Sequence, residues 1–158
     1  MSTVVRRPVA FVAAIVLFVE AVGIVLINGI MATVVKNQDM SLAGLESDAM
    51  SSGTWVMGGV FGLYLLLSGL VLLLTGIRDR APGRIGRIAL ITCAVVHGVL
   101  GALTVGLVGW AAFGFMMVVL GLIVLTLVAY GPRPGPVGPG PEAVRPADDA
   151  GPNAPAPI

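Results

Sequence analysis

The sequence contains few charged residues. Of its 158 residues only 11% are Asp, Glu, Lys or Arg, whereas 57% are hydrophobic. A soluble domain carries about 25% charged residues and covers its surface with polar groups, so this composition excludes a soluble globular domain. The net charge of +1 gives no basis for binding nucleic acid. We therefore expect an integral membrane protein whose first partner is the lipid bilayer.

Residues that could act in catalysis or bind a metal are equally scarce. Cys93 is the only cysteine and can form no internal disulfide, and His97 is the only histidine. A Ser–His–Asp set and a tetrahedral zinc site therefore lack the residues they need. The motifs of zinc proteases, phosphate-binding loops and serine hydrolases are also missing. We expect a protein that is not an enzyme, with no catalytic residue, cofactor or metal.

Long hydrophobic runs, by contrast, are abundant. Residues 8–35 and 54–77 each exceed the ~20 residues that the hydrocarbon core of a bilayer requires. The 43 residues 88–130 contain no charged side chain, and one helix of that length would extend about 64 Å, twice the hydrocarbon thickness. They are predicted to form two spans, about 88–107 and 110–130. The predicted fold is an all-α, four-helix transmembrane bundle.

The first run also resembles a cleavable signal peptide. Arg6 and Arg7 precede it, and residues 19–21 form an acceptable cleavage site. However, the apolar pattern continues as far as Val35, and Glu20 falls where a signal sequence stays apolar. An uncleaved transmembrane helix is the favoured interpretation.

The segments between and beyond the runs are polar. Residues 36–53 form either an ordinary loop or a short helix on the membrane surface, and residues 78–87 form a short basic loop that suits contact with anionic lipid headgroups. Residues 131–158 contain nine prolines and are predicted to be a disordered, partly polyproline-II tail. Binding of that tail to a partner module is the alternative.

Basic residues predict the orientation of the four spans. All eight arginines fall on one side of the four-span arrangement, whereas Lys36 falls on the other. Because cytoplasmic segments carry the excess of Lys and Arg, both termini, including residues 1–7, are predicted to be cytoplasmic. Eight arginines against one lysine also indicate a bacterial source, so the expected location is the bacterial cell (plasma) membrane.

A few polar side chains lie inside the predicted spans. A charged residue near the bilayer centre costs about 2.5–3.5 kcal/mol on insertion scales, and such residues face protein or water. Counted from the cytoplasmic ends at 1.5 Å per residue, four side chains share a depth of about 14–20 Å: Glu20, Tyr64, Ser68 and His97. Asn28 lies on nearly the same helix face as Glu20.

The Glu20 and His97 pair has two functional interpretations. It is either a structural clamp that joins helices, or a site that relays protons or coordinates a cation. A third possibility is that the two side chains do not meet. Asn28 suits a hydrogen bond between helices, toward Thr104.

Small residues predict how the helices pack. A ridge with a spacing of four runs along the third span, and a second pair lies in the second span. Small residues let membrane helices approach closely, so each set is expected to face another helix, in this chain or in another copy. The ridge is Ala94, Gly98, Ala102 and Gly106, and the pair is Gly58 and Gly62.

These observations favour an accessory or scaffold subunit of a membrane assembly, whose partner is another membrane protein or a second copy. The alternative is an oligomeric channel or proton-coupled carrier that uses Glu20, His97 and Asn28.

Overall fold

The computed structural model describes residues 3–38, 44 and 46–131. Within these residues the chain is all-helical and has no strand, and each of the four helices is long and apolar enough to cross a membrane. This confirms the predicted all-α fold with four candidate spans. The proposed disordered tail lies outside the described residues. The helices are α1 (Thr3–Asn37), α2 (Ser47–Arg78), α3 (Arg84–Leu107) and α4 (Trp110–Ala129).

α1, α2 and α3 extend beyond the hydrophobic runs that predicted them, whereas α4 ends at Ala129, just short of the end of its run. α1 begins ahead of Pro8, which therefore lies inside the helix and removes one backbone hydrogen bond near its amino end. α2 begins at Ser47 rather than near residue 54, so the end of the expected loop continues α2 instead of forming a separate surface helix. α2 ends at Arg78, and Asp79 follows in the left-handed conformation with φ 49°.

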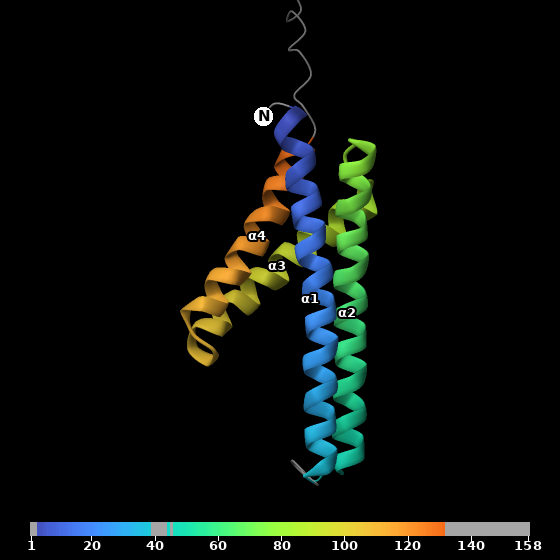
Figure 1. Ribbon diagram of the computed structural model, residues 1–158, viewed down its shortest axis with the longest axis vertical. Helices are drawn as coiled ribbons and strands as arrows, with labels where there is room; N and C mark the ends of the chain where they lie inside the picture. Colours follow the sequence, from blue (N-terminus) through green and yellow to red (C-terminus); the bar gives the residue numbers. More distant parts are fainter. Residues whose placement is uncertain (1–2, 39–43, 45, 132–158) are drawn as a thin grey trace, which may run out of the picture.

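The four helices form two antiparallel hairpins. α1 and α2 lie side by side along their whole length, whereas α3 and α4 lean away from them toward the connection between α3 and α4 (Figure 1). That connection is a tight turn in which Gly109 has φ 117°, a conformation that glycine adopts without steric cost. The second hairpin docks mainly through α4 on α1.

Polar contacts join the ends of the helices. At one end, Arg6 Nη2 lies 2.9 Å from Asp79 Oδ1, so the beginning of α1 meets the turn after α2. At the opposite end, Lys36 Nζ lies 3.5 Å from Asp48 Oδ1 on the exposed surface. The arginines of α1, α2 and the turn therefore gather at one end of the hairpin, as alternating helix directions require.

Glycines of α2 bring α1 and α2 into close contact. A Cβ added at Gly58 would lie 2.5 Å from Asn28 Cβ, and one added at Gly69 would lie 2.9 Å from Phe18 Cε1. A Cβ at Gly62 would meet Val25 Cγ2. Gly62, Gly69 and Gly76 recur every seven residues. A seven-residue step rotates only about 20° around a helix, so these glycines stay on the face that α1 covers.

The small-residue ridge of α3 is covered by another helix only in its first half. Ala94 is buried, and a Cβ at Gly98 would lie 3.3 Å from Leu120 Cδ1 of α4, but Ala102 is exposed and a Cβ at Gly106 would meet nothing within 4 Å. Each four-residue step turns about 40° around a helix, so the ridge rotates out of the interface. Gly101 is instead the residue at which α3 packs closely against α4, where an added Cβ would meet Met117.

Candidate functional site: the Glu20 and His97 pair

Glu20 of α1 and His97 of α3 meet between the two hairpins. The distance from His97 Nε2 to Glu20 Oε2 is 3.0 Å, and the side chains are 3% and 12% exposed respectively. α1 and α3 share little other packing. The pair therefore links two helices that apolar contacts alone hold weakly.

A second hydrogen bond sets the number of protons in the pair. His97 Nδ1 lies 2.8 Å from the carbonyl oxygen of Cys93, one turn earlier in α3. A carbonyl oxygen can only accept a hydrogen bond, so Nδ1 carries a proton and donates it. The contact between Nε2 and Glu20 then needs one further proton, which lies on either the carboxyl group or the imidazole. In both cases the pair has no net charge.

Electrical neutrality suits the position of the pair inside an apolar bundle. An isolated ion in a low-dielectric interior is strongly destabilised, whereas a hydrogen-bonded neutral pair is not. A proton can move between Oε2 and Nε2 without changing the total charge. Adding or removing a proton would leave one buried charge uncompensated.

The Cys93 thiol adds a third group beside the imidazole. Its Sγ lies 3.6 Å from His97 Nδ1, while Glu20 approaches the other ring nitrogen. The three groups thus form a chain through the imidazole and do not converge on one point. Within residues 3–38, 44 and 46–131, no cluster of three or more His, Cys, Asp and Glu is arranged to hold a metal ion.

Tyr64 forms a second polar link between the hairpins. Its hydroxyl donates a hydrogen bond of 2.9 Å to the carbonyl oxygen of Ala89 in α3. Ala89, Cys93 and His97 are spaced four residues apart, so they lie along one side of α3. This strip of α3 accepts a hydrogen bond from α2 and forms another with α1.

Asn28, Thr104 and Ser68 remain separate from the pair. Asn28 Nδ2 donates to the carbonyl oxygen of Ile24 in its own helix, at 2.8 Å. Thr104 Oγ1 likewise bonds to Gly101 within α3. Ser68 is buried, and its hydroxyl has no hydrogen-bond partner among the described residues. A continuous polar path through the bundle is therefore not formed by these side chains.

A separate cluster forms at the arginine-bearing end. Arg6, besides pairing with Asp79, places its guanidinium carbon 4.7 Å from the centre of the Tyr130 ring. Arg7 donates to the carbonyl oxygens of Gly76 and Ile77 at 3.2 and 3.0 Å. Burial, followed by the nearby Asp79 carboxylate, raises the pKa of the Tyr130 hydroxyl above its usual value.

From the sequence, Arg6 and Arg7 were interpreted as basic residues ahead of the first span and as markers of orientation, so this cluster was not predicted. The available signal was Asp79, the one acidic residue in the basic segment 78–87. Tyr130 is buried, and its ring lies beneath the Arg6 guanidinium group.

Comparison with known proteins adds no family to this description. A scan against protein-family models, a search of curated proteins and a search of solved structures each give no match. The four apolar helices are compatible with a small multi-pass membrane protein.

Proposed function

We propose that this chain is a non-enzymatic accessory or scaffold subunit of a membrane assembly, and that its partner is another membrane protein or a second copy. The observation that carries the proposal is an open apolar groove of about 380 Å³ between the two hairpins. Residues of α1, α2 and α3 line it, including Asn28, Phe61 and Val99. Ala102 and Gly106 do not line the groove, but they follow the lining residues Val95 and Val99 at a spacing of seven and so continue the same face of α3.

Two features support occupation of this groove by a helix. Small residues allow the backbone of a partner helix to approach closely, which is how helices associate in lipid. Asn28 supplies a polar group on the groove wall; its carboxamide oxygen is a hydrogen-bond acceptor that its bond to Ile24 does not use. The Glu20–His97 and Tyr64–Ala89 links hold the hairpins at the angle that keeps the groove open.

Site-specific photo-crosslinking in native membranes tests this proposal. A photo-reactive residue at Val99 lies in the groove, and one at Val118 on α4 provides a control. The two positions lie equally far from the turn between α3 and α4, so they sample a similar depth. We expect a discrete protein adduct from Val99 and none from Val118. Differently tagged copies would reveal whether the adduct is a second copy.

Adducts to lipid alone at both positions would contradict the scaffold proposal. The same result at Val99 and Val118 with many protein species would also contradict it, since it would indicate random collision in the membrane.

We also propose that both termini lie in the cytoplasm, as the distribution of arginines predicts. With the arginine-bearing end in the cytoplasm, the segment after α4 would extend into the cytoplasm as well. A bacterial cell membrane is the location that we propose.

The second candidate is a proton-coupled carrier or channel. The observation that favours it is the 3.0 Å contact between Glu20 and His97 near the middle of their helices. The two side chains share one proton there. In liposomes, such a carrier would show a proton flux that Glu20→Gln abolishes. We expect the wild-type chain to show no flux above that of protein-free liposomes. A flux that depends on Glu20 would replace the scaffold proposal.

A further inference from the structure

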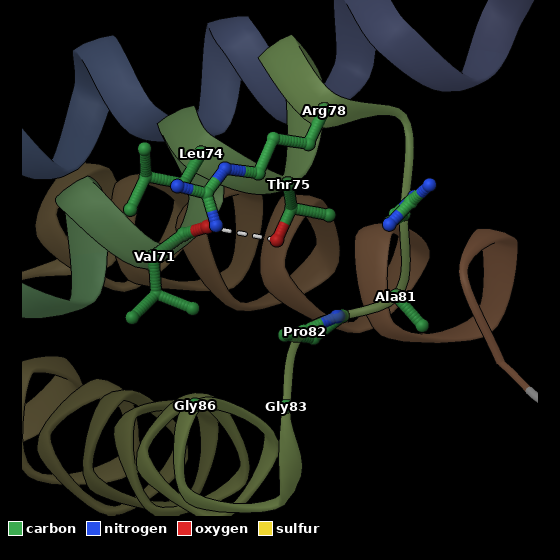
Figure 2. A pocket seen from close by; sticks show the side chains of 9 residues that line it. Val71, Leu74, Thr75, Arg78, Ala81, Pro82, Gly83 and Gly86 are labelled. Carbon is green, nitrogen blue, oxygen red and sulfur yellow. Dashed lines mark hydrogen bonds between the residues drawn. The ribbon is translucent and has the colours of Figure 1, made fainter.

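An open cavity of about 340 Å³ lies at the turn between α2 and α3 (Figure 2). Its basic lining residues are Arg78 and Arg80, and its apolar wall includes Val71 and Leu74 of α2. Figure 2 shows the Arg78 side chain folded back along α2, with its guanidinium group over the turn that holds Val71 and Thr75. The cavity thus combines positive charge with an apolar wall.

The arginines of this cavity differ from those of α1. Arg6 is neutralised by Asp79, and Arg7 donates to two backbone carbonyl oxygens. Arg78 and Arg80 form neither an ion pair nor a side-chain hydrogen bond with any residue in the described part of the chain. Their guanidinium groups are therefore available to an external anion.

The chemistry of the cavity selects a phosphate group. A guanidinium presents a planar set of N–H donors that matches two oxygens of a phosphate. The amino end of α3 adds a favourable dipole, because Gly83 precedes the helix and no side chain caps its first N–H groups. Thr75 is buried in the same wall. Its hydroxyl donates to the carbonyl oxygen of Val71, so the arginines and the amino end of α3 are the donors that face a phosphate.

The position of the cavity distinguishes a lipid from a soluble anion. It lies between the spans Ser47–Arg78 and Arg84–Leu107, which places it at the membrane interface, where phospholipid headgroups reside. The exposed Leu74 on its wall continues into the apolar surface of α2. A lipid can place its phosphate on the arginines and its acyl chains along that surface.

We propose that this cavity binds the phosphate group of an anionic phospholipid at the arginine-bearing interface. The ligand class is a phosphodiester without a compensating positive headgroup, such as phosphatidylglycerol. Phosphatidylcholine carries the same phosphate, but its choline cation opposes binding beside two arginines. The site does not depend on the groove between the hairpins, so it is separable from the scaffold function.

Native mass spectrometry of the detergent-purified full-length chain tests the proposal. Phosphatidylglycerol is titrated into the wild type, the Arg78→Gln and Arg80→Gln single variants and the double variant. Loss of a charge-assisted hydrogen bond to the phosphate weakens binding about ten-fold, so we expect at least about a ten-fold weaker affinity for the double variant. Arg84→Gln is the matched control, because Arg84 lies at the same end but does not line the cavity.

The comparison of ligands identifies the source of the phosphate. We expect tighter binding of phosphatidylglycerol than of phosphatidylcholine, and no retained adduct with inorganic phosphate alone. An equal loss of affinity in Arg84→Gln would indicate general surface charge and overturn the site. Equal binding of the two lipids, or saturation by inorganic phosphate that blocks the lipid, would also overturn it.

Misfolding of the double variant is distinguished by a second measurement. Both arginines are exposed, so the variant should unfold in lipid-free detergent at the same temperature as the wild type. If it does not, the two single variants decide the question. Unchanged lipid affinity in both of them would overturn the proposal.

Discussion

Glu20 Oε2 and His97 Nε2 lie 3.0 Å apart and share a single proton, because the other ring nitrogen of His97 donates to the carbonyl oxygen of Cys93. The pair joins α1 to α3, while the hydrogen bond from Tyr64 to Ala89 joins α2 to α3. The second hairpin is thus fastened to both helices of the first by polar contacts.

Substitution of Glu20 distinguishes a hydrogen bond from an ion pair. A glutamine at this position can donate an amide N–H to His97 Nε2, so Glu20→Gln should change the free energy of unfolding by less than about 1 kcal/mol. Glu20→Leu leaves Nε2 buried without a partner and should cost about 1–2 kcal/mol. Unfolding in mixed micelles measures both.

The double variant Glu20→Leu/His97→Leu completes this comparison. It removes both polar groups, so it should recover part of the stability that Glu20→Leu loses. A Glu20→Gln variant as unstable as Glu20→Leu would instead show that the carboxyl group is ionised.

The glycine face of α2 predicts a position-specific loss of stability. Gly62→Ile would force a side chain against Val25 and the backbone of Ala21, and overpacking of this kind costs about 1–3 kcal/mol. Gly59→Ile is the control, since a Cβ there meets nothing within 4 Å. Thermal unfolding in detergent should separate the two variants clearly. Equal effects would mean that α1 does not cover this face.

Asp79 combines a charge with an unusual backbone conformation. Asp79→Asn keeps a residue type that tolerates φ 49° and removes only the pairing with Arg6, so the loss should stay below about 1 kcal/mol for this partly exposed pair. Asp79→Ala also incurs the left-handed strain of about 1 kcal/mol. Denaturation curves that place the alanine variant above the asparagine variant in stability would contradict this account.

Tyr130 predicts a loss of stability at alkaline pH. It follows the span Trp110–Ala129, and its raised pKa means that the folded protein favours the neutral phenol. This contribution is complete below the unfolded pKa of about 10 and is lost as the pH rises through the folded pKa. Tyr130→Phe keeps the ring beneath Arg6 and removes the ionisation.

We therefore expect Tyr130→Phe to be at least as stable as the wild type at neutral pH, because the Tyr130 hydroxyl is buried without a hydrogen-bond partner in the described chain. The variant should also lose less stability than the wild type above pH ~10. Parallel unfolding measurements across this range provide the check. Identical pH profiles would show that Tyr130 does not contribute.

The orientation of the spans is directly measurable. Reporter fusions placed after residue 131 and in the segment between α1 and α2 should give cytoplasmic and external signals respectively, because eight of nine basic residues fall on one side. A substituted-cysteine variant at Asp48 should react with an impermeant reagent in intact cells. Protection of that position, with an external signal after residue 131, would reverse the proposed orientation.

The number of spans was predictable because charge and length limit it strongly. A run without charge such as residues 88–130 cannot remain one helix in a bilayer, and the structure divides it near Gly109. The common depth of Glu20 and His97 was also readable, since depth follows from a fixed rise per residue. Depth does not specify which helix faces turn together, so their contact needed the structure.

Other features lacked a distinctive signal in the sequence. The partner of Tyr64 is a backbone carbonyl oxygen, a group that every residue carries, so residue types could not identify Ala89. The ridge with a spacing of four was visible, but its rotation around α3 leaves Ala102 and Gly106 uncovered. The seven-residue spacing of Gly62, Gly69 and Gly76 was present in the sequence and predicts a continuous contact face more reliably.

The separation of 77 residues between Glu20 and His97 bears on how the chain enters the bilayer. At about 5–20 residues per second, the ribosome adds the histidine several seconds after the glutamate. α1 and α2 are complete once Arg78 has been added, before His97 is made, so at that stage the Glu20 carboxyl group has no imidazole beside it. We therefore expect the nascent α1–α2 hairpin either to carry a protonated Glu20 or to be retained at the insertion machinery until α3 has been synthesised.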